Sequence, residues 1–121
     1  MIIRLKDGVS LDHMHHRIYS AIGLLAPLFD QFGCRELWIT GARERGHTTN
    51  PDVGRQFHWL PDSTCQAIDI RTHDITGDKH DMQRIVARLL GPSYDVILES
   101  IGTSNEHLHI QYDPERPGTI V

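Results

Sequence analysis

The segment His107–Tyr112 most constrains the fold, because polar and apolar residues alternate strictly along it. The polar members share one face and the apolar members share the other: His107, His109 and Gln111 against Leu108, Ile110 and Tyr112. A period of two predicts a strand with one buried face. Two histidines two residues apart on a strand project from the same face, and imidazole is a frequent zinc ligand. The polar face is therefore either simply solvated or the active face of the protein.

The composition is that of a single soluble domain, and we expect one domain over residues 1–121. Hydrophobic residues make up 39% of the chain and charged residues 23%, as in ordinary globular proteins. The net charge of −4, with no basic cluster, gives no electrostatic footprint for nucleic acid or for an anionic membrane surface. We find no secretory signal and no apolar run of bilayer length. A monomer, cytoplasmic as synthesised and with reduced cysteines, is expected.

Two helices are predicted from apolar residues that recur at three- and four-residue steps. The first is expected to begin at Ser10, a good N-cap residue, and to run to about Phe32. Pro27 removes a backbone donor inside it, so we expect a kink or a break nearby. The second is expected to begin at Asp78 and to stop at Gly91.

Short alternating runs predict the strands, at residues 2–5, 36–40, 65–71, 94–99 and 107–112, with the last two forming a hairpin. The chain from 41 to 64 is rich in Gly, Pro, Asn and Asp and is longer than a structureless loop usually is, which is typical of a functional loop. Together these elements predict an α+β domain with a small, mainly antiparallel sheet and two helices packed on it.

Three residues satisfy the requirements of a catalytic zinc site, which usually has three protein ligands and one open position. They are His58 in the long loop, Asp69 in the middle of a strand, and His109. Glu106 would be the general base for a water whose pKa zinc lowers. By strict alternation Glu106 belongs to the apolar face, so this role requires it to turn back from the end of the strand.

The order and type of these residues resemble the zinc D-Ala-D-Ala carboxypeptidases and phage peptidoglycan peptidases of the Hedgehog/DD-peptidase fold. The resemblance covers roughly residues 36 to 112 and rests on the loop histidine His58, Ala67-Ile68-Asp69, and Glu106-His107-Leu108-His109. Thr40-Gly41-Ala42-Arg43 also resembles the Ser-Gly-x-Arg segment of that family.

The resemblance implies a zinc peptidase that cleaves peptidoglycan stem peptides, either as a D-Ala-D-Ala carboxypeptidase or as an endolysin-type endopeptidase. Such an enzyme would act on the cell wall when a phage lysis or virion system delivers it. The implied roles, position by position, are zinc ligation by His58, Asp69 and His109, general base catalysis by Glu106, oxyanion stabilisation by His107, and binding of a substrate carboxylate by Arg43.

Several alternatives stay open at the level of the sequence. His47 could replace His58 as the loop ligand, and Arg45 and Arg55 compete for the carboxylate role. The same fold could also serve as a non-catalytic, zinc-containing module that binds cell wall or peptide. A cysteine hydrolase that uses Cys65 with a nearby histidine is a third hypothesis.

Overall fold

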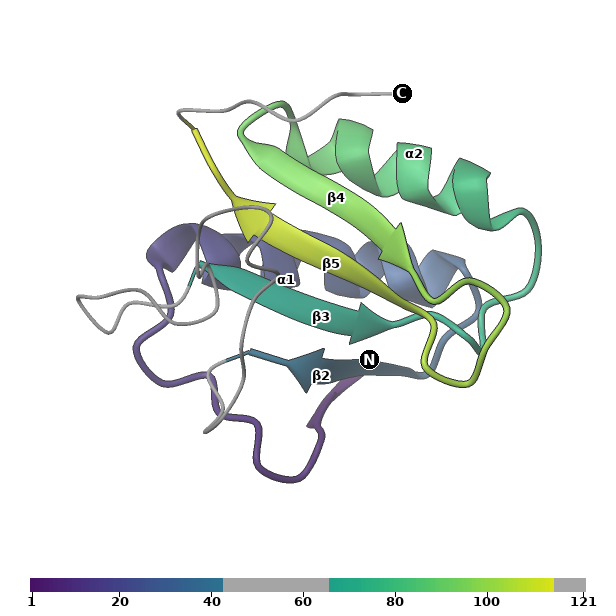
Figure 1. Cartoon of the computed structure of the whole chain (residues 1–121), viewed down its shortest axis with the longest axis horizontal. Helices are drawn as coiled ribbons and strands as arrows, with labels where there is room; N and C mark the ends of the chain where they lie inside the picture. The colour runs from purple at the N-terminus through teal and green to yellow at the C-terminus, as the bar shows by residue number, and fades with distance from the viewer. Residues whose placement is uncertain (43–65, 115–121) are drawn as a thin grey trace.

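The protein folds as an α+β unit with one five-stranded sheet and two helices (Figure 1), which confirms the predicted class. The computed structural model describes residues 1–42 and 66–114. In chain order the elements are β1 Ile2–Leu5, α1 His16–Gln31, β2 Glu36–Gly41, β3 Ala67–Arg71, α2 Lys79–Leu90, β4 Tyr94–Glu99 and β5 His107–Tyr112. The strands lie side by side in the order β1-β2-β3-β5-β4.

The sheet is mixed, because β1 pairs with β2 in parallel. The pairings of β2 with β3, β3 with β5, and β4 with β5 are antiparallel, and the predicted hairpin has the predicted bounds. The parallel pair follows from the connection between its strands. Helix α1 lies between β1 and β2 in the chain, and a helical crossover is the usual way to join neighbouring parallel strands.

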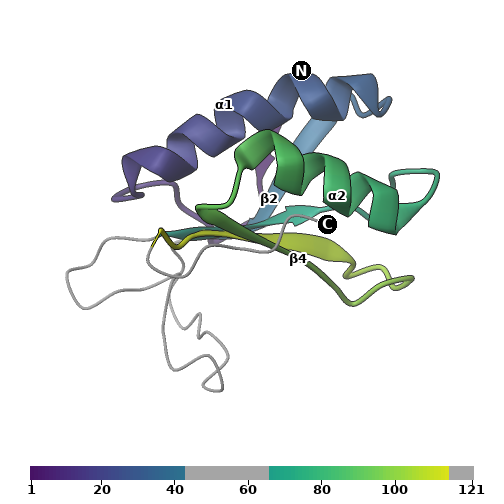
Figure 2. The ribbon, with the colours of Figure 1, turned by 90° about the horizontal axis from the view of Figure 1, so that it is seen from above.

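Both helices cover the same face of the sheet (Figure 2). Apolar side chains of the central strands fill the space beneath them and are fully buried, namely Ile68, Ile70, Leu108 and Ile110. Helix α1 contributes Ile18, Leu25 and Phe29 to the same core. In the described part of the chain, neither helix is long and apolar enough to cross a membrane.

The first helix begins later than predicted. Its N-cap is His15, whose Nδ1 accepts a hydrogen bond from the backbone N–H of Arg17 at 3.1 Å. Ser10 instead accepts from the N–H of Asp12 in a preceding turn. The helix also continues through Pro27, so of the expected kink or break the break does not occur. Buried residues on both sides of the proline anchor α1 to the core, which offsets the missing backbone hydrogen bond.

The second helix has the predicted ends. The side chain of Asp78 accepts hydrogen bonds from the backbone N–H groups of His80 and Asp81, so it supplies acceptors for two otherwise unpaired donors of the first turn. Gly91 ends the helix with a φ of 91°, in the region that glycine adopts without strain.

The face of the sheet opposite the helices carries the polar residues of β3 and β5. Cross-strand register places Asp69 opposite His109, and His109 is opposite Ile97 on β4. His107 is opposite Glu99 in the same hairpin. The two predicted faces of β5 are therefore confirmed, and the histidines lie on the face that the helices leave uncovered.

Candidate metal centre

Asp69 and His109 meet at the centre of the open face. Because their strands pair antiparallel in this register, the two side chains project from the same face at one level. Oδ1 of Asp69 lies 2.9 Å from Nδ1 of His109, and the two side chains are only 15% and 14% exposed. Two of the predicted zinc ligands are thus brought together by the backbone alone.

Glu99 is the third member of this group, and the sequence did not single it out. Its Oε1 lies 4.0 Å from Nδ1 of His109, and one ligand atom from each of Asp69, Glu99 and His109 lies within 4.8 Å of the others. An imidazole and two carboxylates are ligand types that several divalent metals, zinc among them, accept, and we refer to Asp69, Glu99 and His109 as the metal group because they could hold such an ion. Within residues 1–42 and 66–114 this is the one His, Cys, Asp and Glu group with this geometry.

His109 has acceptors on both ring nitrogens. Nδ1 faces Asp69, and Nε2 lies 2.8 Å from Oε1 of Gln111. Burial by itself lowers the pKa of His109, but the hydrogen bond and charge of Asp69, with smaller effects from Gln111 and Glu99, outweigh it and raise that pKa. A metal ion at Nδ1 therefore has to displace a proton from a ring that its neighbours help to protonate.

His107 occupies the same face, two residues before His109 along β5. Its Nδ1 lies 2.7 Å from the carbonyl oxygen of Asn105, and its Nε2 lies 3.2 Å from Oε1 of Glu99. The side chain is 16% exposed. The ring is therefore held between the loop and the Glu99 carboxylate, beside the metal group, and its role towards an oxyanion remains a prediction.

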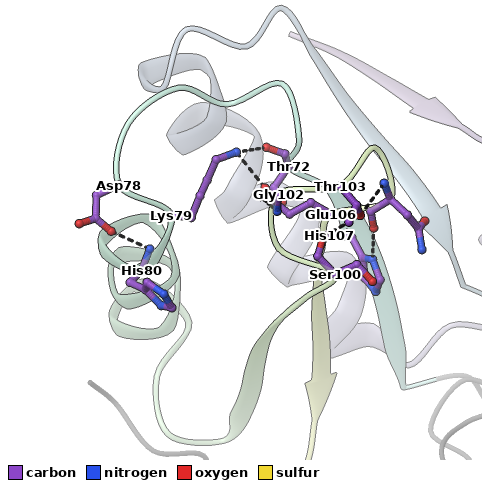
Figure 3. Close-up of polar contacts among 10 residues, drawn as sticks. Thr72, Asp78, Lys79, His80, Ser100, Gly102, Thr103, Glu106 and His107 are labelled. Atoms are coloured by element: carbon purple, nitrogen blue, oxygen red, sulfur yellow. Dashed lines mark hydrogen bonds and ion pairs between the residues drawn. The ribbon is translucent and has the colours of Figure 1, made fainter.

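Glu106 lies apart from this group and reaches Lys79 at the start of α2 (Figure 3). Its Oε2 accepts hydrogen bonds from Nζ of Lys79 at 2.8 Å and from Oγ1 of Thr72 at 2.7 Å. The backbone N–H of Gly102 donates to its Oε1 at 3.2 Å. Only 2% of the residue is exposed, so the carboxylate binds the hairpin loop to the start of α2 and does not face the open side.

The contacts of Glu106 keep it ionised. Burial by itself raises the pKa of this carboxyl, but the hydrogen bonds from Lys79, Thr72 and Gly102 and the charge of Lys79 outweigh it and leave the pKa below its ordinary value. Such a group is a poor proton acceptor and a good structural anion. These contacts give the predicted role of Glu106 as general base no support.

Six residues with predicted or alternative roles lie in or directly after the long loop: Arg43, Arg45, His47, Arg55, His58 and Cys65. All six lie outside the described residues, so the predictions about them stay as they were. The other cysteine, Cys34, is half-buried with a free thiol, and burial raises the pKa of that thiol.

Gly41 at the end of β2 allows Asp69 its position. The two residues are paired across a register shift, and the carboxylate of Asp69 lies directly over the glycine. A Cβ at position 41 would be 2.4 Å from Oδ2 of Asp69, far inside van der Waals contact. The glycine of the Thr40–Arg43 segment is therefore needed for close packing against a residue of the metal group.

A scan of family models and searches of curated proteins and of solved structures found no match to this chain.

Replacing Glu106 by glutamine is expected to destabilise the fold by about 1–3 kcal/mol at neutral pH, because hydrogen bonds to a buried anion are lost. The folded-state pKa of Glu106 lies below that of an unfolded glutamate, about 4.3. Its contribution is therefore complete above that value and is lost as the pH falls through the folded pKa. Urea denaturation of both proteins at several pH values measures the difference.

The matched control for this prediction is Glu36→Gln. Glu36 pairs with Arg4 on the surface, where its side chain is 35% exposed, and such pairs contribute about 0–1 kcal/mol. A stability difference between the parent and Glu106→Gln that is the same at neutral and acidic pH would contradict the role assigned to the carboxylate.

Gly41→Ala is expected to destabilise the protein by about 1–3 kcal/mol, because the new methyl group overpacks the carboxylate of Asp69. Asp69 must move, so the NMR signals of the His109 ring should shift as well. Gly23→Ala is the control, since a Cβ there meets nothing within 4 Å and alanine favours the helix interior by up to about 1 kcal/mol. Equal stability and unchanged His109 signals in Gly41→Ala would show that the close contact does not constrain the site.

Proposed function

We propose that this protein is a zinc-dependent peptidase that hydrolyses peptidoglycan stem peptides. The observation that carries the proposal is the group formed by Asp69, Glu99 and His109 on the open face of the sheet. The substrate class rests on the resemblance described above, of which Asp69 and His109 are the members that meet in space.

In this proposal Asp69 and His109 hold the metal. Zinc there would polarise the scissile carbonyl and lower the pKa of a coordinated water. The third ligand is His58, as the resemblance implies. The ligands that the sheet supplies are held rigidly, because Asp69 is flanked by the buried Ile68 and Ile70. A ligand from the long loop completes the set around an open position.

We assign general base catalysis to Glu99 in place of Glu106. The side chain of Glu99 is 47% exposed, and its carboxylate is 4.0 Å from Nδ1 of His109. Its Oε1 also contacts Nε2 of His107, which orients it. Glu99 would take a proton from the attacking water as the new C–O bond forms. It would return that proton to the amine nitrogen as the C–N bond breaks.

The substrate peptide would lie across the open face, with its scissile carbonyl above Asp69 and His109. Arg43 follows directly after Gly41 and Ala42 in the chain, and Gly41 packs against Asp69. A carboxylate anchor at that point suits a carboxypeptidase, whose substrate ends close to the scissile bond. An endopeptidase does not need such an anchor.

Zinc content and release of peptide fragments from purified cell wall test the proposal together. The parent is expected to hold about one zinc per chain and to release fragments until a chelator is added. Asp69→Ala should lose both properties. Glu99→Gln should keep its zinc and lose about 100-fold or more in turnover, while Glu36→Gln, a carboxylate outside the metal group, should behave like the parent.

Other outcomes would contradict parts of this proposal. A parent protein that takes up no zinc even after supplementation would remove the mechanism. Zinc binding with wall binding but no hydrolysis would favour the non-catalytic module. Loss of turnover in folded Glu106→Gln, with turnover retained in Glu99→Gln, would return the base role to Glu106.

A further inference from the structure

A chain of hydrogen bonds runs from the metal group into the neighbouring strand. Nε2 of His109 is 2.8 Å from Oε1 of Gln111, and Nε2 of Gln111 donates to Oδ2 of Asp95 at 2.8 Å. Gln111 is only 5% exposed, and Asp95 is its cross-strand partner on β4. The amide of Gln111 is therefore enclosed between an imidazole and a carboxylate.

Asp95 fixes which group donates and which accepts in each of these hydrogen bonds. A carboxylate only accepts hydrogen bonds, so Asp95 must receive the N–H of the Gln111 amide. The oxygen of that amide then points at His109 and accepts in turn. Nε2 of His109 must therefore carry a hydrogen.

The same chain defines what lies between His109 and Asp69. By the same rule the carboxylate of Asp69 accepts a hydrogen bond from Nδ1 of His109, 2.9 Å away. A zinc ion at Nδ1 would take the place of the hydrogen between these two atoms, whereas the hydrogen on Nε2 would stay on Gln111. The ring is thus oriented so that its ligand atom points at a carboxylate that is itself a metal ligand type.

We propose that Gln111, held by Asp95, is the positioning residue that selects Nδ1 of His109 as the zinc ligand and sets the affinity of the site for zinc. This inference rests on the proposed function, because it concerns the same metal group. Residues that accept the second ring N–H of a metal-binding histidine fix its tautomer and orientation, and their loss typically costs about 10- to 100-fold in metal affinity.

The first experiment determines which ring nitrogen of His109 carries the hydrogen in the zinc-loaded parent by nitrogen NMR of the imidazole rings. We expect the hydrogen on Nε2 and zinc on Nδ1. A hydrogen on Nδ1, with zinc on Nε2, would overturn the inference whatever the zinc affinity is. This measurement needs no variant.

The second experiment measures zinc affinity by competition with a chelator for three variants. Gln111→Met keeps the length of the side chain but removes the acceptor, and it should bind zinc about 10- to 100-fold more weakly. Asp95→Asn allows the amide of Gln111 to turn over and offer its N–H to His109, so it should also weaken binding and change the tautomer. A merely structural role for the Asp95–Gln111 hydrogen bond would survive this change, because asparagine can still form it.

The third variant exchanges the two groups. In the double variant Asp95→Asn, Gln111→Glu, the carboxylate at 111 accepts from His109 and from the amide at 95, so the original polarity returns. We expect zinc affinity within a few-fold of the parent and the original tautomer. If the double variant binds as weakly as Asp95→Asn while remaining folded, or if Gln111→Met binds like the parent, the inference is wrong.

The two proposals fail in different ways. If the parent and Asp69→Ala bind zinc equally poorly, the proposed metal site is wrong. If the parent binds zinc through Asp69 but neither Gln111→Met nor Asp95→Asn changes the affinity or the tautomer, only the positioning role is wrong. Thermal denaturation of each variant identifies any that fails to fold, and the tautomer of the parent then decides.

Discussion

Asp69 and His109 stand opposite each other because β3 and β5 pair antiparallel in a single register. The register is held from the other side of the sheet, where Ile70 lies opposite Leu108 and Ile68 opposite Ile110, all four fully buried. Sliding one strand would expose this apolar set to water, and each fully buried side chain contributes about 1.5–3 kcal/mol. The hydrophobic core thus determines where the polar groups meet.

Much of the fold could be predicted from the sequence because its signals are local. Alternation along 94–99 and 107–112 was enough to place both strands of the hairpin, and Asp78 and Gly91 marked the ends of α2. The start of α1 was misplaced because Ser10 and His15 both offer a side-chain acceptor to a nearby N–H. Such local hydrogen bonds occur in turns as well as at helix ends. The parallel pairing of β1 depends on tertiary packing, which a four-residue strand does not encode.

Some residues of the candidate site could also be found from local sequence patterns, and others could not. Asp69 and His109 could be found because each lies on a strand with a clear alternating pattern. Glu99 was missed, because its own strand does not show that it lies beside His109. The signal that could have found it is the register of the predicted hairpin, which places Glu99 opposite His107 and so on the same face. Glu106 shows the reverse case: alternation assigned it to the apolar face, and its buried contacts with Lys79 and Thr72 agree with that assignment.

The two faces of β5 are written into alternate residues of a single six-residue strand. The core residues and the candidate site residues of β5 therefore depend on the same two-residue alternation. Inserting or deleting one residue within this strand would turn His109 towards the helices and an aliphatic side chain towards solvent at the same time. In evolution, point substitutions can alter the polar face without disturbing the apolar one, but length changes inside the strand would remove both together. Variation in length should therefore accumulate in the turn at 100–106 and outside the central strands.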